Sequence, residues 1–139
     1  MRIMRLATRQ RELLLNEHKT LILCVDDEEL PLTLRKLVLE KQGYTVETVR
    51  SATEAMRTLS DHPVDLVLTD QVMPGGTGPE LAQSITKRWP ELPVILISGV
   101  NTIPPDAMYA DMFISKVEGP AAMCAKISAV LAARRCSSL

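Results

Sequence analysis

The chain has 139 residues, of which 46% are hydrophobic and 24% charged, enough for one soluble domain with a substantial core. A formal net charge of -1 gives no electrostatic reason to expect nucleic acid or an acidic membrane surface as a partner. The apolar runs are too short to span a bilayer, no signal-peptide pattern is present, and the three cysteines have neither metal nor disulfide spacing, so we expect a cytoplasmic protein with reduced thiols.

Residues 1–19 form a basic N-terminal extension, with five Lys or Arg residues against two Glu. A coiled-coil arm, the remnant of an interdomain linker and a docking helix are possible functional interpretations of such a segment. Its apolar spacing is irregular and no heptad persists, which favours a solvated basic helix.

The next elements are two strands and two helices. Residues 21–25 are a continuous apolar run, typical of a parallel strand buried on both faces, whereas residues 45–49 alternate apolar and polar side chains as an edge strand does. Ser51 and Glu54 form a capping-box signature that opens the second helix. The first helix ends at Gly43, and its helical spacing predicts a buried face made of four residues, Leu30, Leu34, Leu37 and Val38.

A third helix separates the third and fourth predicted strands, at residues 65–69 and 94–98. Both strands are nearly continuous apolar runs, interrupted only by Asp65 and Thr69 at the ends of the third strand and by Ser98 at the end of the fourth. Thr77 and Glu80 repeat the capping signature, and Pro79 suits the first helical turn. The apolar residues that share one face of this helix are Leu81, Ile85 and Trp89.

The last part of the chain is less regular. Pro104 and Pro105 forbid a helix through that point, so we expect a fourth helix of about two turns or less, over residues 106–110, or a loop in its place. Residues 112–115 are the fifth predicted strand. Pro120 opens a final helix that we expect to end near residue 131, with a buried face formed by Met123, Ile127, Val130 and Leu131.

Five strands that alternate with helices predict a doubly wound α/β domain, a five-stranded parallel sheet with helices on both faces. We assign this domain to residues 20–134, between the extension at 1–19 and a tail at 135–139. In such sheets, ligands bind outside the carboxyl ends of the strands. The residues that directly follow the strands are therefore the candidates for chemistry.

Four of the five strands end in, or lead directly into, a carboxylate, hydroxyl or ammonium group. Asp26 and Asp27 follow the first strand, Asp70 the third, Ser98 ends the fourth, and Lys116 follows the fifth. Three carboxylates at one edge of a sheet repel one another unless a cation joins them, and Mg²⁺ suits a site with few carboxylates. An aspartate beside such an ion, with a lysine and a hydroxyl, has the parts required for phosphoryl transfer to a carboxylate.

This ordered set resembles the signature of the response-regulator receiver family of two-component signal transduction. The resemblance extends from about residue 20 to about residue 131, and it implies the flavodoxin-like strand order 2-1-3-4-5. The residues that carry it are Asp26, Asp27, the segment Asp70, Gln71, Val72, Met73 and Pro74, then Gly78, Ser98, Gly99 and Lys116.

The resemblance implies a role for each site residue. Asp70 would be the phosphoacceptor, Lys116 would pair with the phosphoryl group, Ser98 would be the switch hydroxyl, and Phe113 would occupy the aromatic switch position. The ligands of Mg²⁺ would be Asp26, Asp27, Asp70 and the main-chain carbonyl of Val72.

The implied function is a phosphorylatable signalling domain, monomeric or weakly dimeric, with no enzymatic activity beyond its own phosphorylation and dephosphorylation. Its phosphoryl group would come from a histidine kinase or a histidine phosphotransfer protein, and a downstream protein partner would read the switch. A constitutive interaction module that keeps the fold without switching is the alternative. A small hydrolase or flavin carrier is disfavoured, because no nucleophile elbow, phosphate loop or cofactor fingerprint is present.

Overall fold

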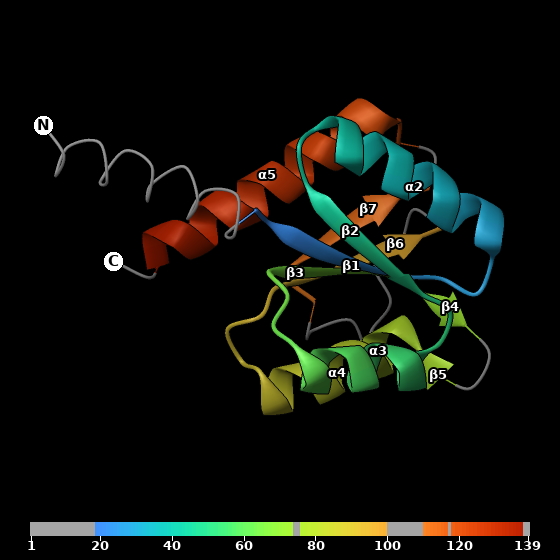
Figure 1. The fold of residues 1–139 in the computed structure, drawn as a ribbon, viewed down its shortest axis with the longest axis vertical. Coiled ribbons are helices and arrows are strands. Elements are labelled where there is room, and N and C mark those ends of the chain that lie inside the picture. The colour runs from blue at the N-terminus through green and yellow to red at the C-terminus, as the bar shows by residue number, and fades with distance from the viewer. Residues whose placement is uncertain (1–18, 74–75, 100–109, 117, 138–139) are drawn as a thin grey trace, which may run out of the picture.

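In the computed structural model, the five predicted strands form one parallel sheet in the order β2-β1-β3-β6-β7 (Figure 1). The structure describes residues 19–73, 76–99, 110–116 and 118–137. The strand order is the predicted 2-1-3-4-5, with the alternating strand β2 at one edge. The strands are β1 (Leu21–Val25), β2 (Thr45–Val49), β3 (Leu66–Asp70), β6 (Val94–Ser98) and β7 (Met112–Ser115).

Only β3 differs from its predicted bounds, by one residue. Asp70 belongs to the strand because it pairs with Ile97 of β6 in the parallel register. A short antiparallel ribbon, β4 (Val72–Met73) and β5 (Gly76–Thr77), follows β3 directly. This ribbon was not predicted from the sequence, since each strand has only two residues and carries no periodic pattern.

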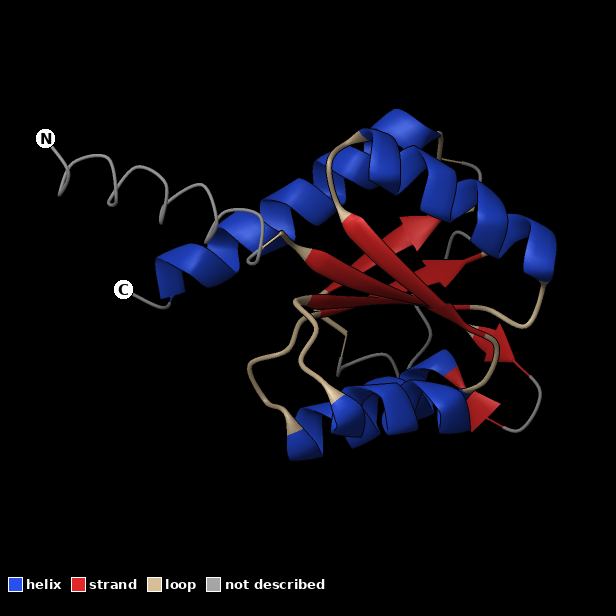
Figure 2. Cartoon of the chain, viewed as in Figure 1, coloured by secondary structure: helices blue, strands red, loops and turns tan. Residues whose placement is uncertain are grey.

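Two pairs of helices cover the sheet (Figure 2). Helices α2 (Glu29–Lys41) and α5 (Pro120–Ser137) lie on one face, and α3 (Ala52–Asp61) and α4 (Gly78–Arg88) lie on the other. Side chains of β1 alternate between the two core layers: Cys24 packs on the α2 side and Leu23 on the α3 side, both with no exposed surface. Each fully buried leucine or isoleucine adds about 2 kcal/mol of hydrophobic stabilisation.

The predicted helix boundaries on the α3 and α4 side are confirmed. Ser51 Oγ accepts a hydrogen bond from the backbone N–H of Glu54 at 3.1 Å, and Thr77 Oγ1 accepts one from Glu80 at 3.2 Å. These bonds satisfy backbone donors that the first helical turn leaves free. At the end of α2, Gly43 has a φ of 95°, a left-handed conformation that favours glycine.

The predicted buried face of α2 is wrong. Leu30, Leu34 and Leu37 are 68%, 53% and 53% exposed, and of the predicted set only Val38 packs against the core. The buried residues of the helix are Leu32 and Leu39. Arg35 lies between these two in the same helical stripe. Because this inward position is occupied by a charged residue, apolar spacing does not identify the buried face of the helix.

Helix α5 is longer than predicted and ends at Ser137 rather than near residue 131. Ala132, Ala133 and Arg134 are strong helix formers, which allows the helix to continue into the segment assigned as a tail. The predicted helix over residues 1–19 and the short fourth helix lie outside the described residues, apart from Lys19 and Ala110. None of the helices in the described part of the chain is long and apolar enough to span a membrane.

Candidate functional site

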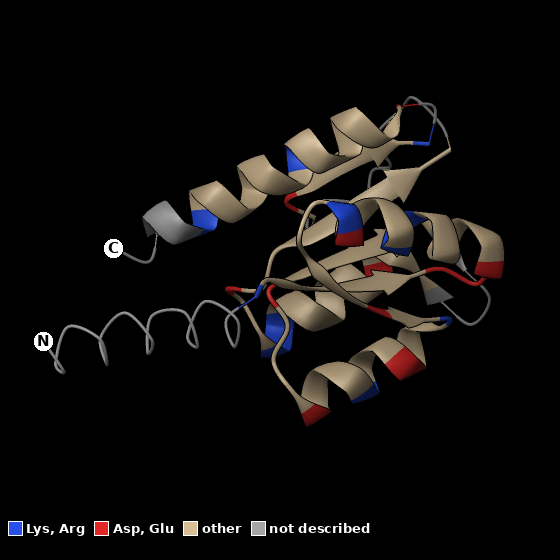
Figure 3. Ribbon diagram, turned by 45° about the horizontal axis from the view of Figure 1, so that its top comes forward, with Lys and Arg blue, Asp and Glu red and all other residues tan. Residues whose placement is uncertain are grey.

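The carboxylates of Asp26, Asp27 and Asp70 converge at the carboxyl end of the sheet. Each offers one oxygen atom, and these atoms lie within 4.8 Å of one another. Asp26 and Asp70 are buried and Asp27 is half-buried. In Figure 3 the loop from β1 into α2 is coloured acidic, whereas the described part of α5 carries basic residues only. The three aspartates that end or follow strands of the sheet therefore lie close together in the folded domain.

Hydrogen bonds to the end of β2 hold the loop that carries Asp26 and Asp27. The N–H of Asp26 donates to the carbonyl of Val49 at 3.2 Å, which extends the pairing of β1 with β2 by one residue. The guanidinium of Arg50 then donates to the carbonyl of Asp27, at 2.8 Å from Nη2 and 3.3 Å from Nε. The Asp27 backbone is consequently fixed by a side chain from the neighbouring strand end.

Lys116 forms an ion pair with the central aspartate. Its Nζ lies 3.1 Å from Asp70 Oδ1, and its backbone N–H donates to the carbonyl of Ser98 at 2.7 Å. Burial raises the pKa of the Asp70 carboxyl, the hydrogen bond from Lys116 opposes this shift, and the charge of Asp26 adds to it. Lys116 therefore favours the ionised form of a carboxylate that its surroundings would otherwise protonate more easily.

Arg35 is a second cation at the site, and the sequence analysis did not identify it. Its Nη1 lies 2.7 Å from Asp26 Oδ2, and the two side chains are only 13% and 1% exposed. The other Asp26 oxygen accepts a hydrogen bond from the N–H of Glu28 at 3.0 Å. Apolar spacing gave no signal for it, because leucines occur on both faces of α2 and do not show which face is inward.

Ser98 lies beside Asp70 on the neighbouring strand and is 4% exposed. Its hydroxyl donates to Gln71 Oε1 at 2.5 Å. Gln71 belongs to the segment that carries the family resemblance, but the sequence analysis gave it no role of its own. No local pattern reveals a contact between residues 27 positions apart.

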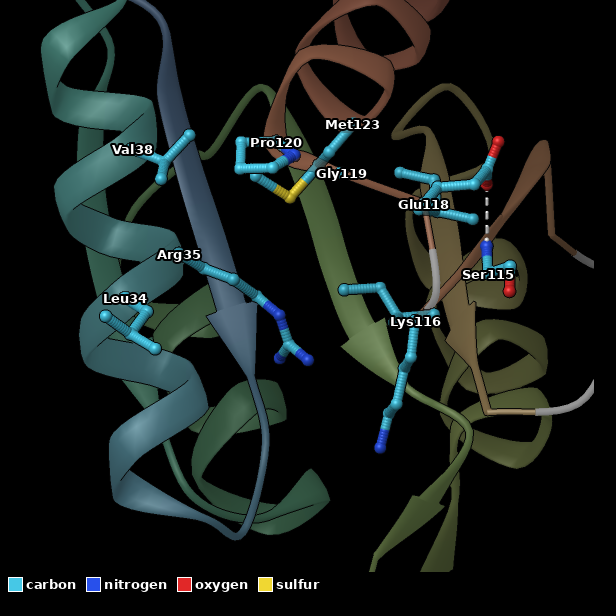
Figure 4. A pocket seen from close by; sticks show the side chains of 11 residues that line it. Leu34, Arg35, Val38, Ser115, Lys116, Glu118, Gly119, Pro120 and Met123 are labelled. Atoms are coloured by element: carbon cyan, nitrogen blue, oxygen red, sulfur yellow. Dashed lines mark hydrogen bonds between the residues drawn. The ribbon is translucent and has the colours of Figure 1, made fainter.

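A pocket of about 300 Å³ opens next to these charges, between α2 and the start of α5. Arg35 and Lys116 project toward it from different elements (Figure 4). Its other walls are largely apolar and include Leu34, Val38 and Met123. The site thus has an apolar entrance on one side of its charged groups.

The donor set fits a small hard cation. Three carboxylate oxygens are ligands of the kind that Mg²⁺ takes, and Mg²⁺ seldom needs more protein ligands because it retains waters. The roles assigned to the Val72 carbonyl and to Phe113 stay predictions. Phe113 is half-buried on the edge strand β7, and its carbonyl accepts a hydrogen bond from Lys126.

Two solved structures of one protein resemble this fold. TrrA from Thermotoga maritima, crystallised in complex with Mg²⁺-BeF, has a TM-score of 0.76 and 28% identity, and the match covers 80% of this chain and 98% of that chain. The structure of TrrA in complex with the histidine kinase ThkA has a TM-score of 0.76 and 29% identity, with 81% and 98% coverage.

Sequence relatives and a family model complete the comparison. GtcR, a response regulator of Aneurinibacillus migulanus, is 36% identical over 114 residues, 79% of this chain and 47% of that protein. The hydrogenase transcriptional regulatory protein HoxA of Cupriavidus necator is 39% identical over 85 residues, 61% of this chain and 17% of that protein. The chain spans less than half the length of both relatives. Residues 22–128 match the model of the response regulator receiver domain. The chain therefore belongs to the response-regulator receiver family and is a receiver domain of a two-component system.

Proposed function

We propose that this receiver domain accepts a phosphoryl group on Asp70 and thereby switches its contacts with other proteins. The observation that carries the proposal is the surroundings of Asp70 Oδ1, which lies 3.1 Å from Lys116 Nζ. Carboxylate oxygens of Asp26 and Asp27 lie within 4.8 Å of an Asp70 oxygen. A nucleophilic carboxylate, an ammonium group paired with it and two further carboxylates are the groups that phosphoryl transfer to an aspartate requires.

In the proposed step, an Asp70 oxygen attacks the phosphorus atom of a phosphohistidine on the donor protein. A P–O bond forms, the P–N bond breaks, and the electron pair returns to the imidazole nitrogen, which takes a proton from solvent. Lys116 then exchanges part of its pairing with the carboxylate for pairing with a phosphoryl oxygen. The Ser98 hydroxyl donates a hydrogen bond to another oxygen of the same phosphoryl group.

Mg²⁺, held by Asp26, Asp27, Asp70 and the main-chain carbonyl of Val72, would supply positive charge that offsets the charge on the transferred oxygens. The three carboxylates favour such an ion electrostatically, because Arg35 and Lys116 balance only two of the three negative charges. The relative TrrA, crystallised with Mg²⁺-BeF, supports this proposal.

We propose a histidine kinase or a histidine phosphotransfer protein as the donor, because TrrA has been crystallised with a histidine kinase. Leu34 is exposed and lines the pocket that Lys116 enters, which gives such a partner an apolar contact close to Asp70. The domain would work in the cytoplasm, where the free thiols of Cys24 and Cys124 stay reduced. Its only chemistry would be its own phosphorylation and dephosphorylation.

The test is the intact mass of the protein after incubation with acetyl phosphate, with and without Mg²⁺. We expect the wild type to gain one phosphoryl group only when Mg²⁺ is present, and Asp70→Asn to gain none. A Glu80→Gln variant is the matched control, because Glu80 is an exposed acidic residue in α4 outside the cluster. A wild type that gains no mass and binds no beryllofluoride would favour a constitutive interaction module instead.

A further inference from the structure

The short hydrogen bond between Ser98 and Gln71 links the ends of two neighbouring strands. Ser98 is the last residue of β6, and Gln71 directly follows the last residue of β3. The donor is Ser98 Oγ, and the acceptor is Gln71 Oε1 at 2.5 Å. Because a serine hydroxyl has one proton, Ser98 cannot donate fully to Gln71 and to a phosphoryl oxygen on Asp70 at the same time.

The backbone of Gln71 is fixed on both sides. Its N–H donates to the carbonyl of Ile97 at 3.0 Å, and its carbonyl accepts from the N–H of Gly78 at 2.8 Å. Gly78 packs so closely that a Cβ atom there would lie 3.1 Å from the Cα of Gln71. With the backbone anchored, the amide can follow Ser98 only by rotation of its own side chain. The two acceptors still compete for the one hydroxyl proton, so donation to a phosphoryl oxygen weakens or breaks the bond to Gln71.

We propose that Gln71 is a positioning residue that holds the Ser98 hydroxyl away from the phosphoryl site in the unphosphorylated domain. The proposal rests on the proposed function, in which Ser98 donates to the phosphoryl group. Gln71 stabilises only the resting arrangement, and an interaction present in one of two states shifts the equilibrium toward that state. Gln71 thereby sets part of the free energy that phosphorylation must supply to move Ser98 toward Asp70.

The size of the effect follows from the bond that is lost. A neutral hydrogen bond in a protein corresponds to about a fivefold change in an equilibrium constant. Without the Gln71 acceptor, the equilibrium between the two positions of Ser98 should shift by this factor away from the resting position. A ligand that mimics the phosphoryl group should then bind about fivefold more tightly.

The experiment measures the Kd of beryllofluoride with Mg²⁺ by calorimetry, for the wild type and for Gln71→Leu, which is similar in size but has no acceptor. We expect a Kd about fivefold lower in Gln71→Leu. In a Ser98→Ala background the same substitution should leave the Kd unchanged, because the hydroxyl through which Gln71 acts is absent. Gln71→Glu keeps an acceptor oxygen, so its Kd should not fall below that of the wild type.

An unchanged or higher Kd in Gln71→Leu would overturn the proposal, and so would an equal gain in the Ser98→Ala background. A wild type that binds no beryllofluoride would overturn the proposed function itself, which is a distinguishable result. Thermal unfolding of the wild type, Gln71→Leu, Ser98→Ala and their double variant without ligand gives a second measurement. The two substitutions should be coupled there as well, since they remove the two ends of one hydrogen bond.

Discussion

Removing Arg35 should destabilise the metal-free domain, because Asp26 depends on it for charge balance. The ion pair is 2.7 Å long, and its side chains are 13% and 1% exposed, so solvent screens it little. Loss of one partner from a buried pair costs about 3–5 kcal/mol. The N–H of Glu28 still donates to Asp26 in the variant, so we expect a value near the lower limit, about 3 kcal/mol.

Urea unfolding of Arg35→Met in metal-free buffer measures this loss, since methionine retains much of the aliphatic stem. Arg50→Met is the matched control, because Arg50 is exposed and hydrogen-bonds only a carbonyl oxygen, that of Asp27, at this site. Arg50→Met should lower the free energy of unfolding by about 1 kcal/mol or less. A similar loss in both variants would refute the importance that we assign to the buried charge.

Mg²⁺ provides a second test of the same reasoning. Arg35 and Lys116 pair with two of the three carboxylates in the wild type, so the variant presents one more unbalanced negative charge to a cation. If its affinity for Mg²⁺ rises tenfold, saturating Mg²⁺ restores about 1.4 kcal/mol of the lost stability. Equal stabilisation of wild type and Arg35→Met by Mg²⁺ would contradict this charge argument.

Three further predictions concern the core, a close contact and pH. Leu37→Ala should lower the free energy of unfolding by less than about 1 kcal/mol, whereas Leu39→Ala on the same helix should lower it by about 3 kcal/mol, because only Leu39 is buried. Urea unfolding of the two variants measures the difference. Gly78→Ala should lower the free energy of unfolding by about 2 kcal/mol or more, since its Cβ would meet the backbone oxygen of Asp70; wild-type stability would refute this. Burial raises the pKa of Asp70, so the native state binds this proton more tightly than the unfolded chain does, and ionisation lowers stability at neutral pH. Asp70→Asn should therefore unfold at a higher temperature than wild type at neutral pH without metal, and the difference should vanish as pH falls below about 4; a pH-independent difference would contradict the assignment.

The strands were predictable because their burial leaves a direct record in the sequence. Residues 21–25 and 94–97 are apolar throughout, as expected of strands that are covered on both faces. Helix α2 was harder, since leucines occur on both its inner and its outer face. The inward position of Arg35 is decided by the attraction of Asp26, a tertiary contact that periodicity does not encode.

The site likewise contains residues that the sequence pattern identifies and residues whose importance depends on tertiary contacts. Asp70, Ser98 and Lys116 could be identified because the topology of a parallel sheet brings strand ends together, whatever lies between them. Gln71 and Arg35 could not be identified in this way. Their importance comes from the side chain that each one contacts, and such contacts depend on rotamers and register within the folded domain.

The resting site is organised so that its functional groups already have partners within the chain. Asp70 pairs with Lys116, Asp26 with Arg35, and Ser98 with Gln71. Among the described residues, no buried side-chain nitrogen or oxygen lacks a hydrogen-bond partner. A phosphoryl group on Asp70 would have to compete with these internal contacts, so its effect on conformation is a difference between two sets of interactions. For this reason, residues that never touch the phosphoryl group can set how readily the domain switches, and changes at Arg35 or Gln71 should tune the response without removing the phosphoacceptor.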